Sequence, residues 1–236
     1  MADERNLSLS QRKILAREQG SPMLPVRFSI SEIRKHFDDS LNAFKAQFAV
    51  ADYLCADGND DGAKMIFRSI VVLVEGLLDF FIHEMSKYCL FKMFNGEWKK
   101  SEKYGSIMVP MNVVEEAIER LESGEWFFAY VNERFSRAVF LSLDSMREQL
   151  NLIGIDFTAV MCVAFPQHSE NESVRYGSDV IRHLFMRRNE IAHQNDRSHA
   201  SALQNDISRE FVADYVSKVE AIVTAIERIA ERKDAC

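Results

Sequence analysis

Turn-forming residues are scarce in this sequence of 236 residues, which contains only 9 glycines and 4 prolines. Because glycine and proline interrupt regular structure, their scarcity predicts long helices joined by few turns. The 17 phenylalanines and 10 methionines suit helix packing, in which irregular gaps must be filled. A chain of this length buries a sizeable core without help from disulfides or metal ions.

Closely spaced cysteines are also missing, which excludes a C-x-x-C or zinc pattern and indicates reduced thiols of a cytosolic protein. His83-Glu84 does not begin a zinc-binding H-E-x-x-H motif, because Lys87 stands where the second histidine is needed. The sequence has neither a G-x-x-x-x-G-K phosphate loop nor a G-x-S-x-G elbow. It therefore predicts no metal and no cofactor. The four cysteines are Cys55, Cys89, Cys162 and Cys236.

No apolar stretch is long enough to cross a bilayer. The most apolar run, residues 70–78, contains Glu75 and Gly76 and is followed by Asp79. The amino-terminal sequence MADERNLSLSQRK lacks the apolar core of a signal peptide. We therefore expect a soluble, cytoplasmic protein without a membrane partner.

Excess positive charge is lacking too, since 29 basic residues stand against 36 acidic ones and the net charge is -7. This balance argues against a protein that coats nucleic acid non-specifically, but it leaves room for a small basic site. The most basic region runs from Arg175 to His199. There, five arginines and three histidines accompany three acidic residues.

Apolar residues recur at helical spacing, which predicts one all-α domain over residues 29–236 after an N-terminal helical arm over residues 1–28. Ser29 and Glu32 form a capping-box pattern at the start of the first domain helix. The segment 155–165 fits a helix or a strand, and the position of a break near Asn132 or Ser136 stays open. The expected helices cover residues 29–56, 61–95, 112–124, 126–152, 178–193 and 208–233.

Two of these helices, over residues 178–193 and 61–95, carry the candidate functional residues discussed below. We expect Ser178 to cap the helix that runs through His193. The helix over residues 61–95 has the longest apolar pattern in the chain. Its expected buried stripe consists of Ile66, Ile70, Leu73, Leu77, Phe80 and Phe81.

Arg188 lies on the apolar side of the helix over residues 178–193. A buried unpaired charge is costly, so Arg188 requires a carboxylate partner or a place at a cleft or subunit boundary. Arg187 points elsewhere and is expected to reach solvent. Asn189 and His193 are one turn apart and share a polar stripe. Arg188 and His193 are offset by about 140° and share no face of a regular helix, and His193 could simply favour the helix dipole as a C-terminal residue.

The segment Arg188-Asn189-Glu-Ile-Ala-His193 resembles the signature of the HEPN superfamily, all-α domains that include many RNases of bacterial defence and toxin systems. The sequence RRNEIAH, followed by a polar loop and a final helix, is most similar to the RiboL-PSP-HEPN branch. The helix over residues 68–84 resembles that branch's early helix, which carries an acidic residue inside an apolar run. Asp79 aligns best with this acid, and Glu75 is the second choice.

The resemblance implies a metal-independent endoribonuclease, in which the 2′-OH of RNA attacks the adjacent phosphate and leaves a cyclic phosphate. His193 would act as general acid or base, Arg188 would stabilise the transition-state charge, and Asn189 would orient the phosphate or the imidazole. It also implies a homodimer with the active site at its interface. As a toxin or antiphage defence effector, the protein would have an antitoxin or an activating partner protein.

Four further arginines could guide an RNA backbone, although solvated surface explains each of them equally well. They are Arg175, Arg182, Arg187 and Arg197. Tyr176 could stack on a base, but a place in the core is the simpler interpretation. Two other functions stay open: a HEPN-like module that binds RNA, a nucleotide or a protein without cleaving, and a plain interaction domain in which Arg188 pairs with Asp79.

Overall fold

The computed structural model describes residues 26–119, 124–198 and 200–235, and within these ranges it contains eight α-helices and one short 3-10 helix but no strand. The predicted all-α fold is therefore confirmed. The N-terminal arm expected over residues 1–28 lies almost wholly outside the described residues. The helices are α1 (Ile30–Ala56), α2 (Asp60–Phe94), η1 (Tyr104–Ser106), α3 (Met111–Glu119), α4 (Glu125–Phe135), α5 (Leu143–Leu152), α6 (Phe157–Ala164), α7 (Glu170–Gln194) and α8 (Arg209–Asp234).

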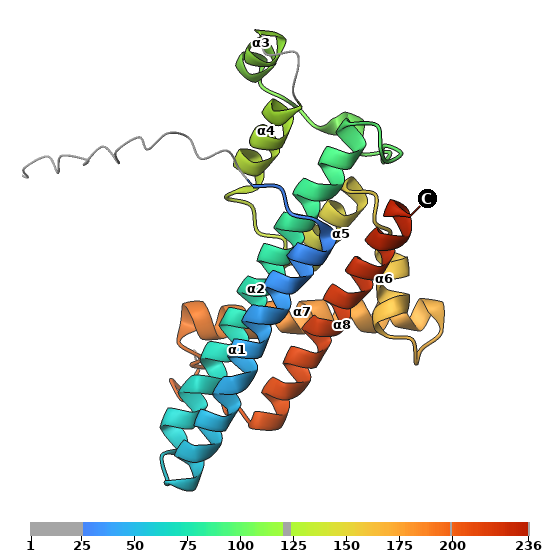
Figure 1. The fold of residues 1–236 in the computed structure, drawn as a ribbon. Helices are drawn as coiled ribbons and strands as arrows, with labels where there is room; N and C mark the ends of the chain where they lie inside the picture. The colour runs from blue at the N-terminus through green and yellow to red at the C-terminus, as the bar shows by residue number, and fades with distance from the viewer. Residues whose placement is uncertain (1–25, 120–123, 199, 236) are drawn as a thin grey trace, which may run out of the picture.

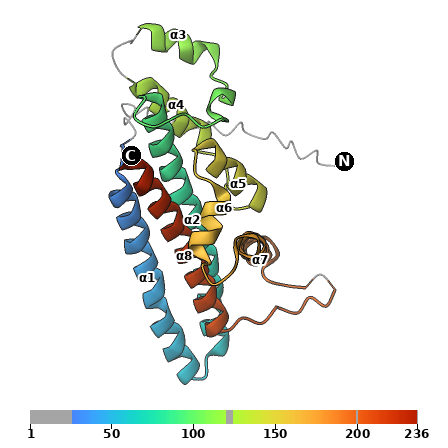
Figure 2. The same cartoon turned by 90° about the vertical axis from the view of Figure 1, so that its right-hand side faces the viewer.

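Three long helices, α1, α2 and α8, lie side by side and form the body of the molecule (Figure 1). Helix α7 crosses this bundle at a steep angle, so it is seen end-on in Figure 2 while the three bundle helices run vertically. Helix α6 packs against both α7 and α8. Helices α3 and α4 lie at one end of the bundle, away from α7. The crossing helix α7 packs against α2 and α6, and Tyr215 of α8 donates a hydrogen bond to its Leu184 carbonyl.

Helix starts follow the local sequence. At α1 the Ser29 hydroxyl accepts from the Glu32 backbone N–H, and the Glu32 carboxylate accepts from the Ser29 backbone N–H at 2.8 Å, which is the predicted capping box. Ser208 caps α8 by accepting from the Phe211 N–H, as its position before the apolar pattern indicated. Asp156 caps the apolar segment after it, so the ambiguous stretch 155–165 is the helix α6.

The start of α7 was predicted incorrectly. The helix begins at Glu170, behind a capping box formed by Ser169 and Glu172, whereas Ser178 lies inside the helix and donates to the Val174 carbonyl at 2.7 Å. The first two turns are polar and carry no apolar stripe, which hid them from the periodicity. Gly177 faces α6, where a Cβ would lie only 2.2 Å from the Met161 sulfur. Its small size therefore allows α7 to approach α6 closely.

Two other helix boundaries differ from expectation. The stretch 126–152 is divided into α4 and α5, because α4 ends before Ser136 and Ser142 caps α5. Helix α3 begins at Met111, so Asn112 lies in its first turn instead of before it. Within the described ranges, no helix is both long and apolar enough to cross a membrane.

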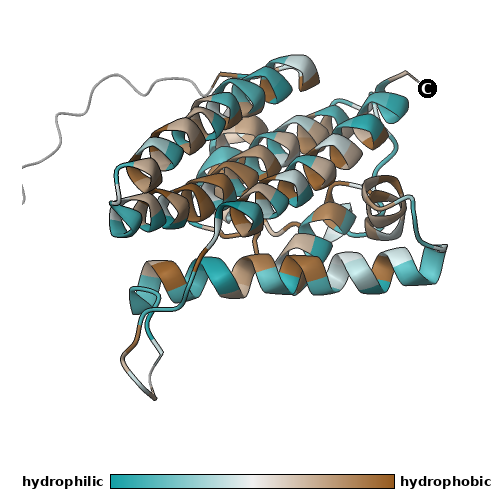
Figure 3. Cartoon of the chain, turned by 90° about the horizontal axis from the view of Figure 1, so that it is seen from below, coloured by the Kyte–Doolittle hydropathy of each residue, from teal (hydrophilic) through white to brown (hydrophobic). Residues whose placement is uncertain are grey.

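The buried stripe of α2 is only partly the expected one. Ile70, Leu77 and Phe81 are buried, Ile66 is half-buried, but Leu73 and Phe80 are 48% and 42% exposed. Helix α2 packs against α1, α4, α7 and α8 on different sides, so buried residues occupy most of its circumference and no single stripe describes it. Figure 3 shows apolar and polar residues mixed along the helix surfaces.

Candidate functional site

The last three turns of α7 bring the three motif residues together. The Arg188 Nη1 atom donates to the Asn189 side-chain oxygen at 3.0 Å and lies 3.3 Å from the His193 Nε2 atom. Arg188 and His193 share no face of the helix, yet the ends of their side chains meet within one copy of the chain. An arginine side chain is long enough to reach around the helix surface, which an angle measured between Cα positions does not take into account.

His193 is exposed, whereas Arg188 and Asn189 are half-buried beside it. The helix ends at Gln194, one residue after His193, and the following Asn195 and Asp196 both adopt positive φ angles, +51° and +56°. The imidazole thus lies at the carboxyl end of α7, at the surface, with a guanidinium held next to it. This arrangement suits the binding of an anion that both side chains can contact.

Arg188 makes no ion pair within the described residues, and its Nε atom is buried without a hydrogen-bond partner there. Its positive charge is consequently available to an added anion. The proposed alternative of a salt bridge between Arg188 and Asp79 is not what the structure contains. Asp79 instead accepts from the Phe140 backbone N–H at 2.7 Å, and its other oxygen lies 3.7 Å from His83 Nε2.

The neighbouring Arg187 is engaged very differently. Its side chain is only 14% exposed and forms a two-point ion pair with the fully buried Asp196, so the expectation that it reaches solvent is wrong. Arg68 of α2 donates to the same carboxylate at 2.6 Å. Burial opposes ionisation of Asp196, but these two arginines outweigh that effect and hold its pKa below the usual value. The network ties the loop after His193 to α2.

Glu75, the second choice in the sequence, is the carboxyl group that lies near Arg188. It is 1% exposed, and burial raises its pKa to about 7, although Tyr215 and Arg188 oppose the increase. One carboxyl oxygen, Oε2, has no hydrogen-bond partner within the described residues. Tyr215 of α8 donates its hydroxyl to the Leu184 carbonyl at 3.0 Å, beside this carboxyl. Residues of α2, α7 and α8 therefore converge beneath Arg188.

The titration of Glu75 predicts a pH-dependent stability. Because the folded-state pKa of about 7 exceeds the ordinary 4.5, the folded protein binds the proton more tightly, and stability falls as pH rises from about 4.5 to about 7. Over this pH range we expect the wild-type protein to lose about 3 kcal/mol of unfolding free energy. The Glu75→Gln variant, which mimics the protonated form, should not show this loss. Urea denaturation at pH 5 and pH 8 measures it. Equal pH dependence in both proteins would contradict the prediction.

The other candidate arginines lie apart from the motif. Arg182 is exposed and pairs with Asp179 at 2.8 Å, while Arg175 is exposed on the first half of α7. Arg197 is in the loop after α7 and donates to the Ala202 carbonyl at 2.8 Å. Arg187 is committed to Asp196. Three of the four candidates therefore remain at the surface, and the fourth stabilises the loop.

Sequence reasoning missed three residues around the motif, which are Arg68, Asp196 and Tyr215. Arg68 and Asp196 are 128 residues apart, so no local spacing could connect them. A signal does exist for Asp196, which lies in the polar loop directly after the motif and beside Asn195, a residue type that tolerates positive φ. Tyr215 matches an ordinary core position of α8 and carries no separate signal. No group of three metal-ligating side chains occurs in the described part of the chain.

The fold and the site together define a class. An all-α domain whose penultimate long helix presents Arg188, Asn189 and His193 at its carboxyl end has the architecture and motif of HEPN domains. The family model of the RiboL-PSP-HEPN family matches residues 26–232, and the chain belongs to this family. No curated protein sequence and no solved structure matches the chain.

Proposed function

We propose that the protein is a metal-independent endoribonuclease of the HEPN type. The observation that carries the proposal is the guanidinium of Arg188, which forms no ion pair among the residues that the structure describes and is held 3.3 Å from the exposed His193 imidazole. A cation beside a group that transfers protons near neutral pH is what the cleavage of RNA by its own 2′-OH requires. Family membership supports the same reaction class.

In the proposed reaction His193 accepts the proton of the ribose 2′-OH as the 2′-oxygen attacks the adjacent phosphorus. The bond from phosphorus to the 5′-oxygen breaks, and the leaving oxygen takes up a proton, which gives a 2′,3′-cyclic phosphate and a free 5′-OH. Arg188 contacts the non-bridging oxygens, where negative charge develops. Asn189 accepts from Arg188 and so fixes the direction of its guanidinium.

Incubation of the purified protein with total RNA in excess EDTA tests the proposal. We expect fragments that end in cyclic phosphate and begin with 5′-OH. Cleavage that needs an added divalent cation, or fragments with 5′-phosphate ends, would exclude this mechanism. RNA binding without any cleavage would instead favour a non-catalytic binding module.

We further propose that the protein acts as a homodimer whose interface includes the exposed apolar face of α2. This face carries Met65, Leu73 and Phe80, which lie seven or eight residues apart and therefore point to one side. Gly76 is also exposed there, one residue after the buried Glu75 near Arg188. A second copy bound to this face would bring its own motif close to the first, and it would supply a second histidine to protonate the leaving oxygen.

A charge on this face is expected to separate the copies. The Leu73→Glu variant should be a monomer, because an ionised carboxylate at the centre of an interface is desolvated without a partner. RNA cleavage per chain should fall at least about tenfold if two motifs share one site. Light scattering after size-exclusion chromatography measures the oligomeric state. The control is Val50→Glu, at an exposed position of α1; a Leu73→Glu protein that remains dimeric would exclude this face.

The proposed biological setting is that of a cytoplasmic toxin or antiphage defence effector. An RNase of this kind requires control, which an antitoxin or an activating partner protein would provide. Arg182 and Arg197, which are exposed on α7 and on the loop after it, are the proposed contacts to the RNA backbone. Arg175 would add a third contact near the start of α7.

A further inference from the structure

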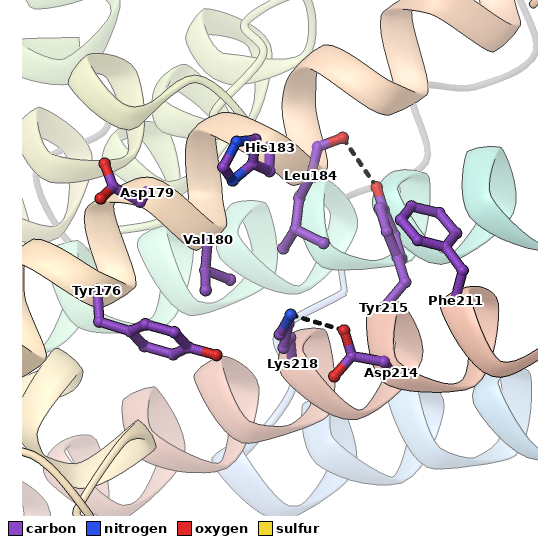
Figure 4. Close-up of a pocket in the computed structure, with 9 residues that line it drawn as sticks. All are labelled: Tyr176, Asp179, Val180, His183, Leu184, Phe211, Asp214, Tyr215 and Lys218. Atoms are coloured by element: carbon purple, nitrogen blue, oxygen red, sulfur yellow. Dashed lines mark hydrogen bonds and ion pairs between the residues drawn. The ribbon is translucent and has the colours of Figure 1, made fainter. Parts of the chain in front are cut away.

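A cavity of about 190 Å³ opens between α7 and α8 (Figure 4). Tyr176, Val180 and His183 come from α7, and Phe211 and Tyr215 come from α8. The cavity does not contain the motif residues. Its lining is mainly apolar, with charged side chains among the lining residues. A pocket of this composition binds a flat, largely apolar group that also carries a few hydrogen-bonding atoms.

Aromatic rings form much of the wall. Phe211 is 42% exposed, although it is large and apolar, and its ring lies 6.2 Å from that of Tyr215. Tyr215 is buried and held in place by its hydrogen bond to the Leu184 carbonyl. Tyr176 is half-buried and packs edge-on against Phe165. Fixed aromatic faces with one exposed ring are suited to stacking against an unpaired nucleobase.

The charged side chains favour a base over a phosphate. Asp179 pairs through Oδ1 with Arg182 at 2.8 Å, and Asp214 pairs through Oδ2 with Lys218 at 2.6 Å. Asp214 lies near Phe211 on α8, whereas Asp179 lies on the other side of the cavity, beyond Val180 (Figure 4). The second oxygen of Asp214 accepts no hydrogen bond within the described residues and is available as an acceptor. A carboxylate repels a phosphate, but it accepts hydrogen bonds from N–H groups. Guanine is the base that presents adjacent ring N–H and amino donors on its Watson–Crick edge.

Two residues that line the cavity, Phe211 and Tyr215, lie beside residues that neighbour the motif. The Arg187 guanidinium lies 5.8 Å from the centre of the Phe211 ring, and Arg187 precedes Arg188 in α7. Tyr215 lies beside Glu75, which in turn lies near Arg188. From His183 to His193 the helix rises about 15 Å. A few nucleotides of extended RNA bridge that distance, so a base in the cavity and a phosphate at the motif can belong to one strand.

We propose that the cavity between α7 and α8 is a base-recognition site of the nuclease, which stacks a single unpaired guanine against Phe211 and hydrogen-bonds its Watson–Crick edge to Asp214. The inference rests on the proposed ribonuclease function, because it assigns the substrate of that site as single-stranded RNA with a guanine near the cleaved bond.

Fluorescence anisotropy with labelled uridine hexamers tests the proposal. The hexamers contain one central guanine, inosine or adenine, and the protein is the full-length His193→Ala variant, which leaves the RNA intact. We expect the guanine hexamer to bind at least about fivefold more tightly than the other two, because inosine lacks the amino group and adenine lacks both donors. Equal affinity for the three hexamers, or no binding of any of them, would overturn the assignment.

Two variants, each combined with His193→Ala, separate stacking from hydrogen bonding. Phe211→Ala should weaken binding of all three hexamers by about tenfold, since a lost stacking partner costs roughly 1–3 kcal/mol per base. The Asp214→Asn variant should bind the guanine and inosine hexamers equally. Tyr53→Ala, at an exposed aromatic residue of α1, is the matched control and should change nothing. Unchanged binding by Phe211→Ala would also overturn the proposal.

Failure of this inference is distinguishable from failure of the proposed function. If the wild-type protein cleaves total RNA but the three hexamers bind equally, the proposed base-recognition site is wrong and the proposed ribonuclease function is supported. If the hexamers show the guanine preference but no RNA is cleaved, the base site stands in a module that binds without cutting.

Discussion

Replacement of Arg188 or His193 by alanine is expected to lower the rate of RNA cleavage by at least about a hundredfold while the protein stays folded. A general acid or base contributes roughly 10²–10⁴ to a rate, and a group that stabilises developing charge contributes about as much. Both side chains lie at the surface end of α7, and Arg188 has no ion-pair partner in the described residues whose loss would unfold the chain. Single-turnover cleavage of a labelled RNA measures the rates.

Matched variants sharpen this test. Arg228→Ala removes an exposed arginine of α8 that is not among the proposed RNA contacts, and it should leave the rate of bond cleavage within about threefold of wild type. Arg188→Lys keeps the charge but loses the planar fork, so it should recover only part of the activity. Cleavage at the wild-type rate by the His193→Ala protein would show that the active site lies elsewhere.

The second large effect concerns stability. The Asp196→Ala variant should lose about 3–5 kcal/mol of unfolding free energy, because it leaves Arg68 and Arg187 buried without their common carboxylate. Urea denaturation at pH 7 measures the loss. In contrast to Arg188→Ala, this variant is expected to impair the fold first and cleavage only as a result.

Asp179→Ala is the matched control, since it breaks an exposed pair on the same helix and should cost less than about 1 kcal/mol. The Arg68→Met, Asp196→Leu double variant removes both the charge and one of its partners, and it should be more stable than Asp196→Ala. Equal stabilities of Asp196→Ala and Asp179→Ala would show that the buried network is unimportant.

Local features of the fold were predictable because they depend on neighbours in the sequence. Ser29 with Glu32 and Ser208 mark helix starts through hydrogen bonds that span only three residues. The start of α7 was missed because Ser169 and Glu172 precede polar turns without an apolar stripe. The exposure of Leu73 and Phe80 depends on which sides of α2 other helices cover, and no spacing within α2 contains that information.

The same distinction applies to the site. Arg188, Asn189 and His193 could be found because they lie within six consecutive residues of one helix. Their surroundings could not be found. Helix periodicity assigns a carboxylate partner to Arg188 and solvent to Arg187, whereas Arg187 pairs with Asp196 and Arg188 forms no ion pair within the described residues. The choice between Asp79 and Glu75 likewise depends on the Phe140 N–H, which lies 61 residues from Asp79 and takes up its carboxylate.

The ion pair between Arg68 and Asp196 has a consequence for when the site forms during synthesis and folding of the chain. The motif is encoded before α8, but its geometry depends on contacts from α2, on the loop after Asp196 and on Tyr215. Closing contacts across such long stretches of chain is slow compared with forming a helix. A chain still emerging from the ribosome, or one cut within the loop, would therefore carry Arg188 and His193 without the arrangement that makes them a site. Under the proposed function, RNA cleavage would therefore begin only after the last helix has docked.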